Sequence, residues 1–153
     1  MSLPILKAMD SREILDAQAE IVDVFSLFDD WTDRYQYIID LGRKLPDLKP
    51  QQKTEENRIK GCQSQVWIIP EHKDGRLHFN AVSDSAIVSG LIALILQVYS
   101  GRRPAEIVAT PPDFIKRIQL EEHLSPTRSN GLNAMVTQIR QFAIEAISMD
   151  RQQ

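Results

Sequence analysis

The sequence has little cysteine, no excess of positive charge and no long apolar run. Cys62 is the only cysteine among 153 residues, so neither an intramolecular disulfide nor a metal cage of several cysteines can form. The formal net charge is -3, whereas domains that bind duplex nucleic acid are usually strongly basic. The longest apolar run, Leu91 to Leu96, is far shorter than the roughly 18 residues that indicate a membrane-spanning helix. These shortages argue against nucleic-acid and membrane binding.

The single cysteine and the short apolar runs also indicate a cellular compartment. A single cysteine without a disulfide partner fits a reducing compartment, and the apolar run at the start of the chain is too short for a signal peptide. We therefore expect a cytoplasmic protein. Hydrophobic residues make up 42% and charged residues 25% of the sequence, as in ordinary globular proteins. The length is that of one domain, and we expect a single domain over residues 1–153.

The first 42 residues predict two helices. Asp10 is a favourable N-cap, and apolar residues then recur at helical spacing to about residue 28. Thr32 can cap a second amphipathic helix, and Gly42 is a suitable stop signal for it.

The middle of the chain predicts β-structure. Val66 to Ile69 is an apolar run of β-favouring residues that we expect to end at Pro70. After the turn pair Asp74-Gly75, apolar and polar residues alternate over 76–81, which indicates a half-buried strand. Residues 57–60 offer a further strand. The expected fold class is α+β, with a small antiparallel sheet of about three strands packed against helices.

Helices return in the second half. Ser83 or Asp84 is expected to cap a helix that runs to about Ser100 and is apolar almost all round, so it should be the central buried helix. Shorter helices are expected over 104–108 and 112–118. Ser125-Pro126 then opens a long final helix, because serine is a good N-cap and proline is favoured at the first helical position.

Cys62 follows Gly61 in a polar segment between β-like runs. Arg58 and Lys60 precede it, and we expect these cations to lower the pKa of the thiol and to raise the fraction of thiolate, which is the nucleophilic form. Against this, a lone cysteine in a reducing compartment is most often a small buried hydrophobic residue. The residues alone leave open a reactive thiol at a loop tip and a core residue of a non-catalytic interaction module.

A thiol hydrolase is a further alternative. It needs a histidine within hydrogen-bond reach of the sulfur. His123 lies just before the last helix and is the histidine that can reach the site, whereas His72 and His78 are expected at the surface. Sequence separation neither supports nor excludes such a Cys–His pair.

Four segments follow one another at a spacing that matches a known family. The first is Arg58-Ile-Lys-Gly-Cys-Gln-Ser-Gln-Val-Trp67, and the others are 83–91, 99–107 and 123–132. Together they resemble the SufE/CsdE family, whose members are sulfur acceptors in iron–sulfur cluster assembly, and the resemblance covers about residues 20 to 145. Ser85 stands where many members have alanine, which affects only the packing beside Asp84.

The resemblance implies that the chain carries sulfur. A PLP-dependent cysteine desulfurase, of the SufS or CsdA type, holds a persulfide on its own cysteine. The thiolate of Cys62 would attack the outer sulfur, become a persulfide itself, and pass the sulfur to an iron–sulfur scaffold protein. Such a chain also stimulates its desulfurase, has no cofactor or metal of its own, and is a sulfur-transfer protein and not a classical stand-alone enzyme.

The resemblance further implies a SufE/IscU-like fold and is compatible with a homodimer. Scaffold proteins of the IscU type need several cysteines to hold a cluster, whereas one is enough for a carrier, because the sulfur arrives at and leaves from the same atom.

Five residues are expected to support Cys62 or to bind its partner. Gly61 gives the loop backbone freedom. Arg128, in the first turn of the last helix, can steady an anionic thiolate or persulfide, or pair with a carboxylate of the desulfurase. Asp84 either caps a helix or anchors the Cys62 loop through backbone N–H groups. Ser83 and His123 complete the set.

Overall fold

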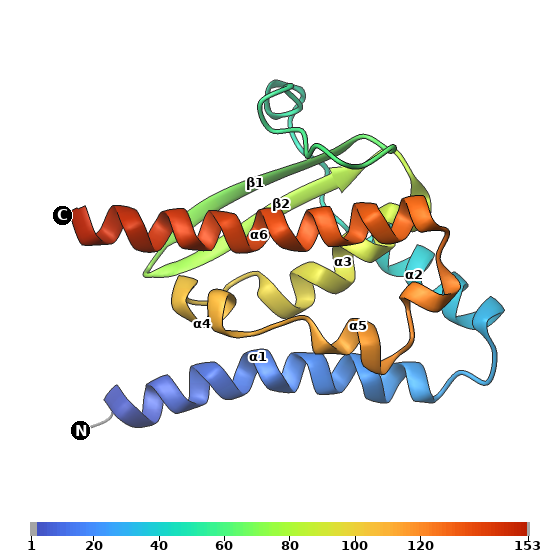
Figure 1. Ribbon diagram of the computed structural model, residues 1–153, viewed down its shortest axis with the longest axis horizontal. Coiled ribbons are helices and arrows are strands. Elements are labelled where there is room, and N and C mark those ends of the chain that lie inside the picture. The colour runs from blue at the N-terminus through green and yellow to red at the C-terminus, as the bar shows by residue number, and fades with distance from the viewer. Residues whose placement is uncertain (1–2, 153) are drawn as a thin grey trace.

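The computed structural model describes residues 3–152, with side chains from residue 13 to residue 150. Helices and one β-hairpin make up an α+β fold, which confirms the expected class (Figure 1). The elements in chain order are α1 (Leu3–Ser26), α2 (Trp31–Arg43), η1 (Pro50–Gln52), β1 (Val66–Lys73), β2 (Arg76–Ser83), α3 (Ala86–Tyr99), α4 (Pro104–Ala109), α5 (Asp113–Arg117), η2 (Glu121–His123) and α6 (Pro126–Gln152).

The hairpin pairs β1 with β2 in antiparallel register, from Val66 opposite Ser83 to Lys73 opposite Arg76. The expectation that β1 ends at Pro70 is wrong, since the strand continues to Lys73. Pro70 lies opposite Phe79, whose N–H points away from β1 and donates to Ser100 Oγ at 2.9 Å. That pair therefore requires no N–H from Pro70, which is why proline is tolerated inside the strand.

The expected third strand is reduced to a single bridge between Arg58 and Trp67, and the sheet of the described residues has two strands. The N–H of Ile59 donates to the carbonyl oxygen of Val66 at 2.8 Å, so the segment does lie along β1. It cannot extend further, because Gly61 turns the chain away with a φ of 92°.

The helix starts differ from the sequence prediction. Helix α1 begins at Leu3, so Asp10 lies inside the helix and does not cap it. Pro4 falls in the first turn, where a missing N–H costs nothing. Helix α2 is capped by Asp30, whose Oδ1 accepts from the N–H of Asp33 at 2.9 Å, and not by Thr32.

Helix α2 ends at Arg43, one residue after the expected stop at Gly42, and Gly42 also makes a close helix contact. A Cβ at Gly42 would collide with the backbone of Gly90 in α3, and a Cβ at Gly90 would overlap the carbonyl oxygen of Ile38. The two glycines thus let α2 and α3 approach more closely than any side chain would allow.

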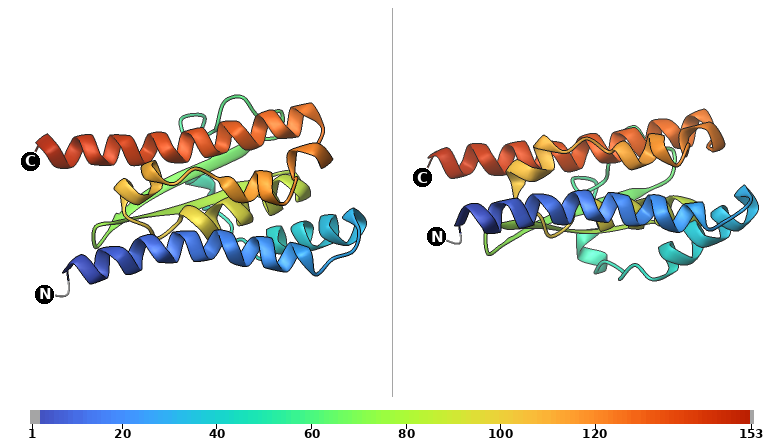
Figure 2. Two further views of the ribbon diagram at one scale, coloured as in Figure 1. Left: turned by 60° about the horizontal axis from the view of Figure 1, so that its bottom comes forward. Right: turned by 90° about the horizontal axis from the view of Figure 1, so that it is seen from below.

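Helix α3 forms the centre of the core, as its apolar sequence predicts. Nine of its residues are buried, and it contacts β2 and helices α1, α2 and α6. Helices α4 and α5 lie between the long helices α1 and α6, and the start of α1 and the end of α6 lie at the same end of the molecule (Figures 1 and 2). No helix within residues 3–152 is long and apolar enough to cross a membrane.

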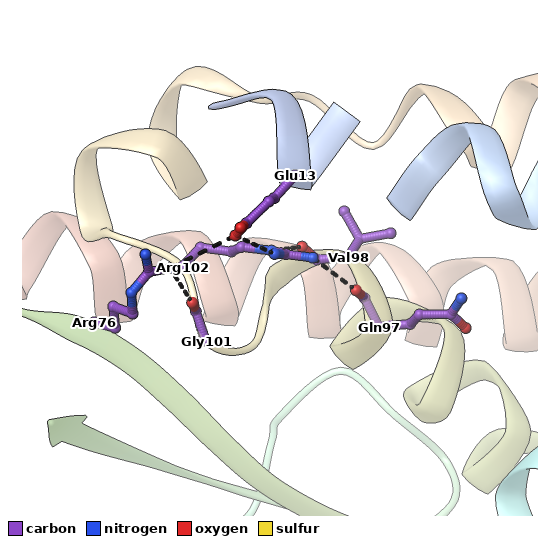
Figure 3. Close-up of polar contacts among 6 residues, drawn as sticks. All are labelled: Glu13, Arg76, Gln97, Val98, Gly101 and Arg102. Atoms are coloured by element: carbon purple, nitrogen blue, oxygen red, sulfur yellow. Dashed lines mark hydrogen bonds and ion pairs between the residues drawn. The ribbon is translucent and has the colours of Figure 1, made fainter. Parts of the chain in front are cut away.

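The carboxyl end of α3 is fixed by a cluster of polar contacts around Glu13 of α1 (Figure 3). Arg102 Nη1 lies 3.5 Å from Glu13 Oε2, and Arg102 Nε donates to the carbonyl oxygen of Val98 at 2.9 Å. Arg76 of β2 also approaches Glu13 and donates to the carbonyl oxygen of Gly101 at 2.9 Å. This cluster ties α1, β2 and α3 together, while the amino end of α3 remains available for the site below.

Candidate functional site

Cys62 lies in the loop between η1 and β1, and its sulfur is directed at α6. The Sγ atom lies 3.6 Å from the carbonyl oxygen of Gly131, to which the thiol can donate a hydrogen bond. The side chain is partly exposed, and it lines a cavity of about 390 Å³ together with residues from the starts of α3 and α6. Cys62 is therefore neither a core residue nor a free loop tip.

The Cys62 loop packs against a part of α6 that carries small residues. Cys62 faces Gly131, and a Cβ at Gly61 would lie 3.3 Å from the Cβ of Ala134, one turn further along the helix. Gly61 has a φ of 92°, which other residues rarely adopt. Small residues on both sides therefore allow the backbone of the loop to pack directly on the helix.

Asp84 anchors the other end of the loop. Its Oδ1 accepts a hydrogen bond from the N–H of Gln65 at 3.0 Å, and its own N–H donates to the carbonyl oxygen of Gln65 at 3.3 Å. Asp84 does not cap α3: the N-cap is Ser85, whose Oγ accepts from the N–H of Val88 at 3.4 Å. Ser83 supports this turn, because its Oγ accepts from the N–H of Ser85 at 3.2 Å.

Arg128 borders the same cavity from the first turn of α6. Ser125 Oγ accepts from the N–H of Arg128 at 3.3 Å, as expected for an N-cap. The Arg128 side chain is exposed and makes no ion pair with any residue whose side chain the structure describes. The guanidinium is therefore free to bind a charged group that enters from outside.

Burial raises the pKa of the Cys62 thiol. The expectation that Arg58 and Lys60 lower it is wrong, because neither cation acts on the sulfur. Arg58 Nη1 pairs with Glu55 Oε2 at 3.6 Å, and Lys60 is exposed to solvent. Desolvation of the thiolate is thus the dominant effect on this pKa, and it favours the thiol form over the thiolate in the docked loop.

His123 does not reach Cys62. Its ring packs against Trp31 with a centroid distance of 4.0 Å, and both ring nitrogens are buried without a hydrogen-bond partner among the described residues. The hydroxyl of Tyr35 donates to its carbonyl oxygen. Within the described part of the chain, none of the three histidines lines the cavity, so the geometry offers no Cys–His pair.

The cavity walls could not be assigned from the sequence. Besides Cys62 and Arg128 they include Ser85, Val88 and Leu91 of the α3 region and Gly131, Leu132 and Met135 of α6. Only Gly131 could have been noticed in the sequence: glycine is unfavourable inside a helix, so a glycine within a predicted helix indicates a close contact at that position.

The described side chains also contain no group of three or more histidine, cysteine, aspartate or glutamate residues placed to hold a metal ion. The functional groups found at this site are the sulfur of Cys62 and the guanidinium of Arg128 beside the cavity, with Asp84 holding the loop.

Comparison with known proteins agrees with this arrangement. The family model described as "SufE: Fe-S metabolism associated domain" matches residues 19–143, which include every residue placed at the site above. The chain belongs to the SufE family. Membership in the SufE family places the chain in iron–sulfur metabolism.

Two relatives within the SufE family are SufE-like proteins from rhizobia, both named as uncharacterized. The one from Rhizobium etli is 44% identical over 130 residues, covering 81% of this chain and 87% of that protein. The one from Rhizobium meliloti is 41% identical over 129 residues, covering 81% of this chain and 92% of that protein.

A solved structure shares the fold. It is the solution structure of a hypothetical protein from Thermus thermophilus, with a TM-score of 0.72 and 20% sequence identity, covering 86% of this chain and 96% of that one.

Proposed function

We propose that this chain is a sulfur acceptor for iron–sulfur cluster assembly in the cytoplasm. It takes sulfur from a PLP-dependent cysteine desulfurase of the SufS or CsdA type onto Cys62 and passes it to a scaffold protein. The observation that carries the proposal is the position of the only thiol: it lies on an anchored loop and lines a cavity that has room beside the sulfur.

The transfer needs no oxidant or reductant. The thiolate of Cys62 attacks the outer sulfur of the persulfide on the desulfurase and forms a new sulfur–sulfur bond. The sulfur–sulfur bond on the desulfurase breaks, and its cysteine leaves as a thiolate with the electron pair. Removal of the persulfide frees the desulfurase for another cycle, which is how an acceptor stimulates the enzyme.

The docked loop is a resting state in this proposal. Burial raises the pKa of the Cys62 thiol, so the docked form is a poor nucleophile. Movement of the loop out of the cavity returns the thiol to solvent and restores its ordinary pKa. Three hydrogen bonds oppose that movement: the thiol donates to the carbonyl oxygen of Gly131, the N–H of Gln65 donates to Asp84 Oδ1, and the N–H of Asp84 donates to the carbonyl oxygen of Gln65. A partner that offers its own donors and acceptors can replace them.

Arg128 takes the role of a charged contact at the edge of the cavity. Its guanidinium is exposed and borders the space beside the sulfur. An arginine binds carboxylates in a planar, bidentate manner, so it suits a carboxylate of the desulfurase, and its charge favours an anionic persulfide nearby.

The direct test is mass spectrometry of the chain after incubation with a cysteine desulfurase and cysteine. We expect one added sulfur atom on Cys62 and no addition on the Cys62→Ser variant. A His123→Ala variant should accept sulfur as the wild type does, whereas a Cys–His hydrolase would lose its activity. Absence of added sulfur on Cys62, or the same mass increase in the Cys62→Ser variant, would disprove the proposal.

A further inference from the structure

Gly131 in α6 faces the sulfur of Cys62 and carries no side chain there. The Sγ atom lies 3.6 Å from the Gly131 carbonyl oxygen, and a Cβ built on Gly131 would lie 3.5 Å from Sγ. Both residues line the cavity. Glycine is among the least favourable residues inside a helix, so its presence in α6 calls for a reason in the packing around it.

Packing against the Cys62 thiol does not require glycine at position 131. The built Cβ would have Sγ at 3.5 Å, Cys62 Cβ at 3.9 Å and Cys62 Cα at 4.0 Å, which are ordinary van der Waals contacts. Gly42 and Gly90 differ, because a Cβ there would overlap backbone atoms. Alanine at position 131 would fit beside the thiol and would favour the helix, so the space exceeds what the thiol needs.

A second sulfur atom accounts for the extra space. A sulfur–sulfur bond is about 2.05 Å long, so the outer sulfur of a Cys62 persulfide would lie within that distance of Sγ. Atoms that are not bonded to each other need roughly 3.5–4 Å. A methyl group 3.5 Å from Sγ would therefore occupy part of the volume that the outer sulfur can reach while the loop stays docked.

We propose that Gly131 is a positioning residue that keeps room beside Cys62 for the outer sulfur, so that the loaded loop docks in the cavity as the unloaded loop does. This inference rests on the proposed function only in that Cys62 carries a persulfide. It predicts that alanine at position 131 disturbs the persulfide form of the docked loop and leaves the thiol form almost unchanged.

The test compares the two forms within each protein. Inorganic polysulfide loads Cys62 without a desulfurase: the thiolate attacks one sulfur of the polysulfide, one sulfur–sulfur bond forms and another breaks, and the shortened polysulfide leaves with the electron pair. Two rates are measured by mass spectrometry, alkylation of the thiol form by iodoacetamide and reduction of the persulfide form by dithiothreitol. The proteins are the wild type, Gly131→Ala, and Asn133→Ala as a control at an exposed position of the same helix.

We expect thiol alkylation within about twofold of the wild type in both variants. Persulfide reduction should be about tenfold faster in Gly131→Ala, since overpacking expels the loaded side chain from the cavity, and unchanged in Asn133→Ala. The ratio of the two rates is the readout, because a loss of overall stability speeds both reactions. An unchanged ratio in Gly131→Ala would overturn the inference.

The outcome also separates this inference from the proposed function. A wild-type protein that accepts sulfur from polysulfide but not from a desulfurase, with the ratio shifted in Gly131→Ala, would support the role of Gly131 and contradict the proposed function. Sulfur uptake from the desulfurase, together with an unchanged ratio in Gly131→Ala, would support the proposed function and contradict the role of Gly131. A wild-type protein that takes up no sulfur from either donor would contradict both.

Discussion

Removal of the Asp84 carboxylate should release the Cys62 loop. The carboxylate accepts the N–H of Gln65 at 3.0 Å, and this hydrogen bond holds the end of the loop against the start of α3. Hydrogen bonds to charged groups contribute about 1.5–3 kcal/mol, but Asp84 is exposed, so we expect about 1 kcal/mol here. That free energy corresponds to about a fivefold increase in the population of open loop.

The assay is the rate of Cys62 alkylation by iodoacetamide at fixed pH, followed by mass spectrometry. Asp84→Ala should react about five times faster than the wild type. Asp84→Asn keeps an oxygen that can accept the N–H of Gln65, so its rate should increase less. The matched control is Asp33→Ala, which removes an exposed carboxylate from the first turn of α2, far along the chain from the loop.

Two results would contradict a role of Asp84 in holding the Cys62 loop. An unchanged rate in Asp84→Ala would mean that the hydrogen bond to Gln65 does not hold the loop. An equal increase in Asp33→Ala would mean that alkylation reports general destabilisation of the protein and not opening of the loop.

Three further predictions concern the fold and the thiol. Gly90→Ala should lower the free energy of unfolding in urea by about 3 kcal/mol or more, because its Cβ would overlap the carbonyl oxygen of Ile38; an unchanged urea midpoint would contradict the close helix contact. Gln18→Leu should cost about 2 kcal/mol in the same assay, since the buried Gln18 side chain accepts the N–H of Phe114 at 2.8 Å; an unchanged urea midpoint would contradict a stabilising role of this hydrogen bond. The pH midpoint of Cys62 alkylation should lie above the value of about 8.5 for a free cysteine, because burial raises the pKa of the thiol; a midpoint below it would contradict the docked state. Because the pKa of this thiol is raised, its contribution to the free energy of unfolding is present below the ordinary thiol pKa and is lost as the pH rises through the raised value. Urea midpoints of the wild type and of Cys62→Ser, compared over this pH range, test this.

Local features of the sequence were sufficient for much of the fold. The apolar run of α3, the Asp74-Gly75 turn and the Ser125-Pro126 helix start act through neighbouring residues, and each element lies where the pattern predicts it. Where the prediction failed, a distant contact decided. Pro70 remains in a strand because the N–H of Phe79, opposite it, donates to Ser100 Oγ and not to β1.

The candidate site divides in the same way. The amino-acid sequence was enough to show that there is one thiol, that it follows a glycine in a polar segment, and that Arg128 belongs to a helix start, whereas the expected capping of α3 by Asp84 was wrong. Long-range packing places the thiol and Arg128 beside one cavity, makes Asp84 a hydrogen-bond acceptor for the Cys62 loop, brings Gly131 to the sulfur, and packs His123 against Trp31 and not against Cys62. It also reversed the expected direction of the thiol pKa, because desolvation depends on which atoms surround a group in space, whereas charges near it in the sequence can point elsewhere.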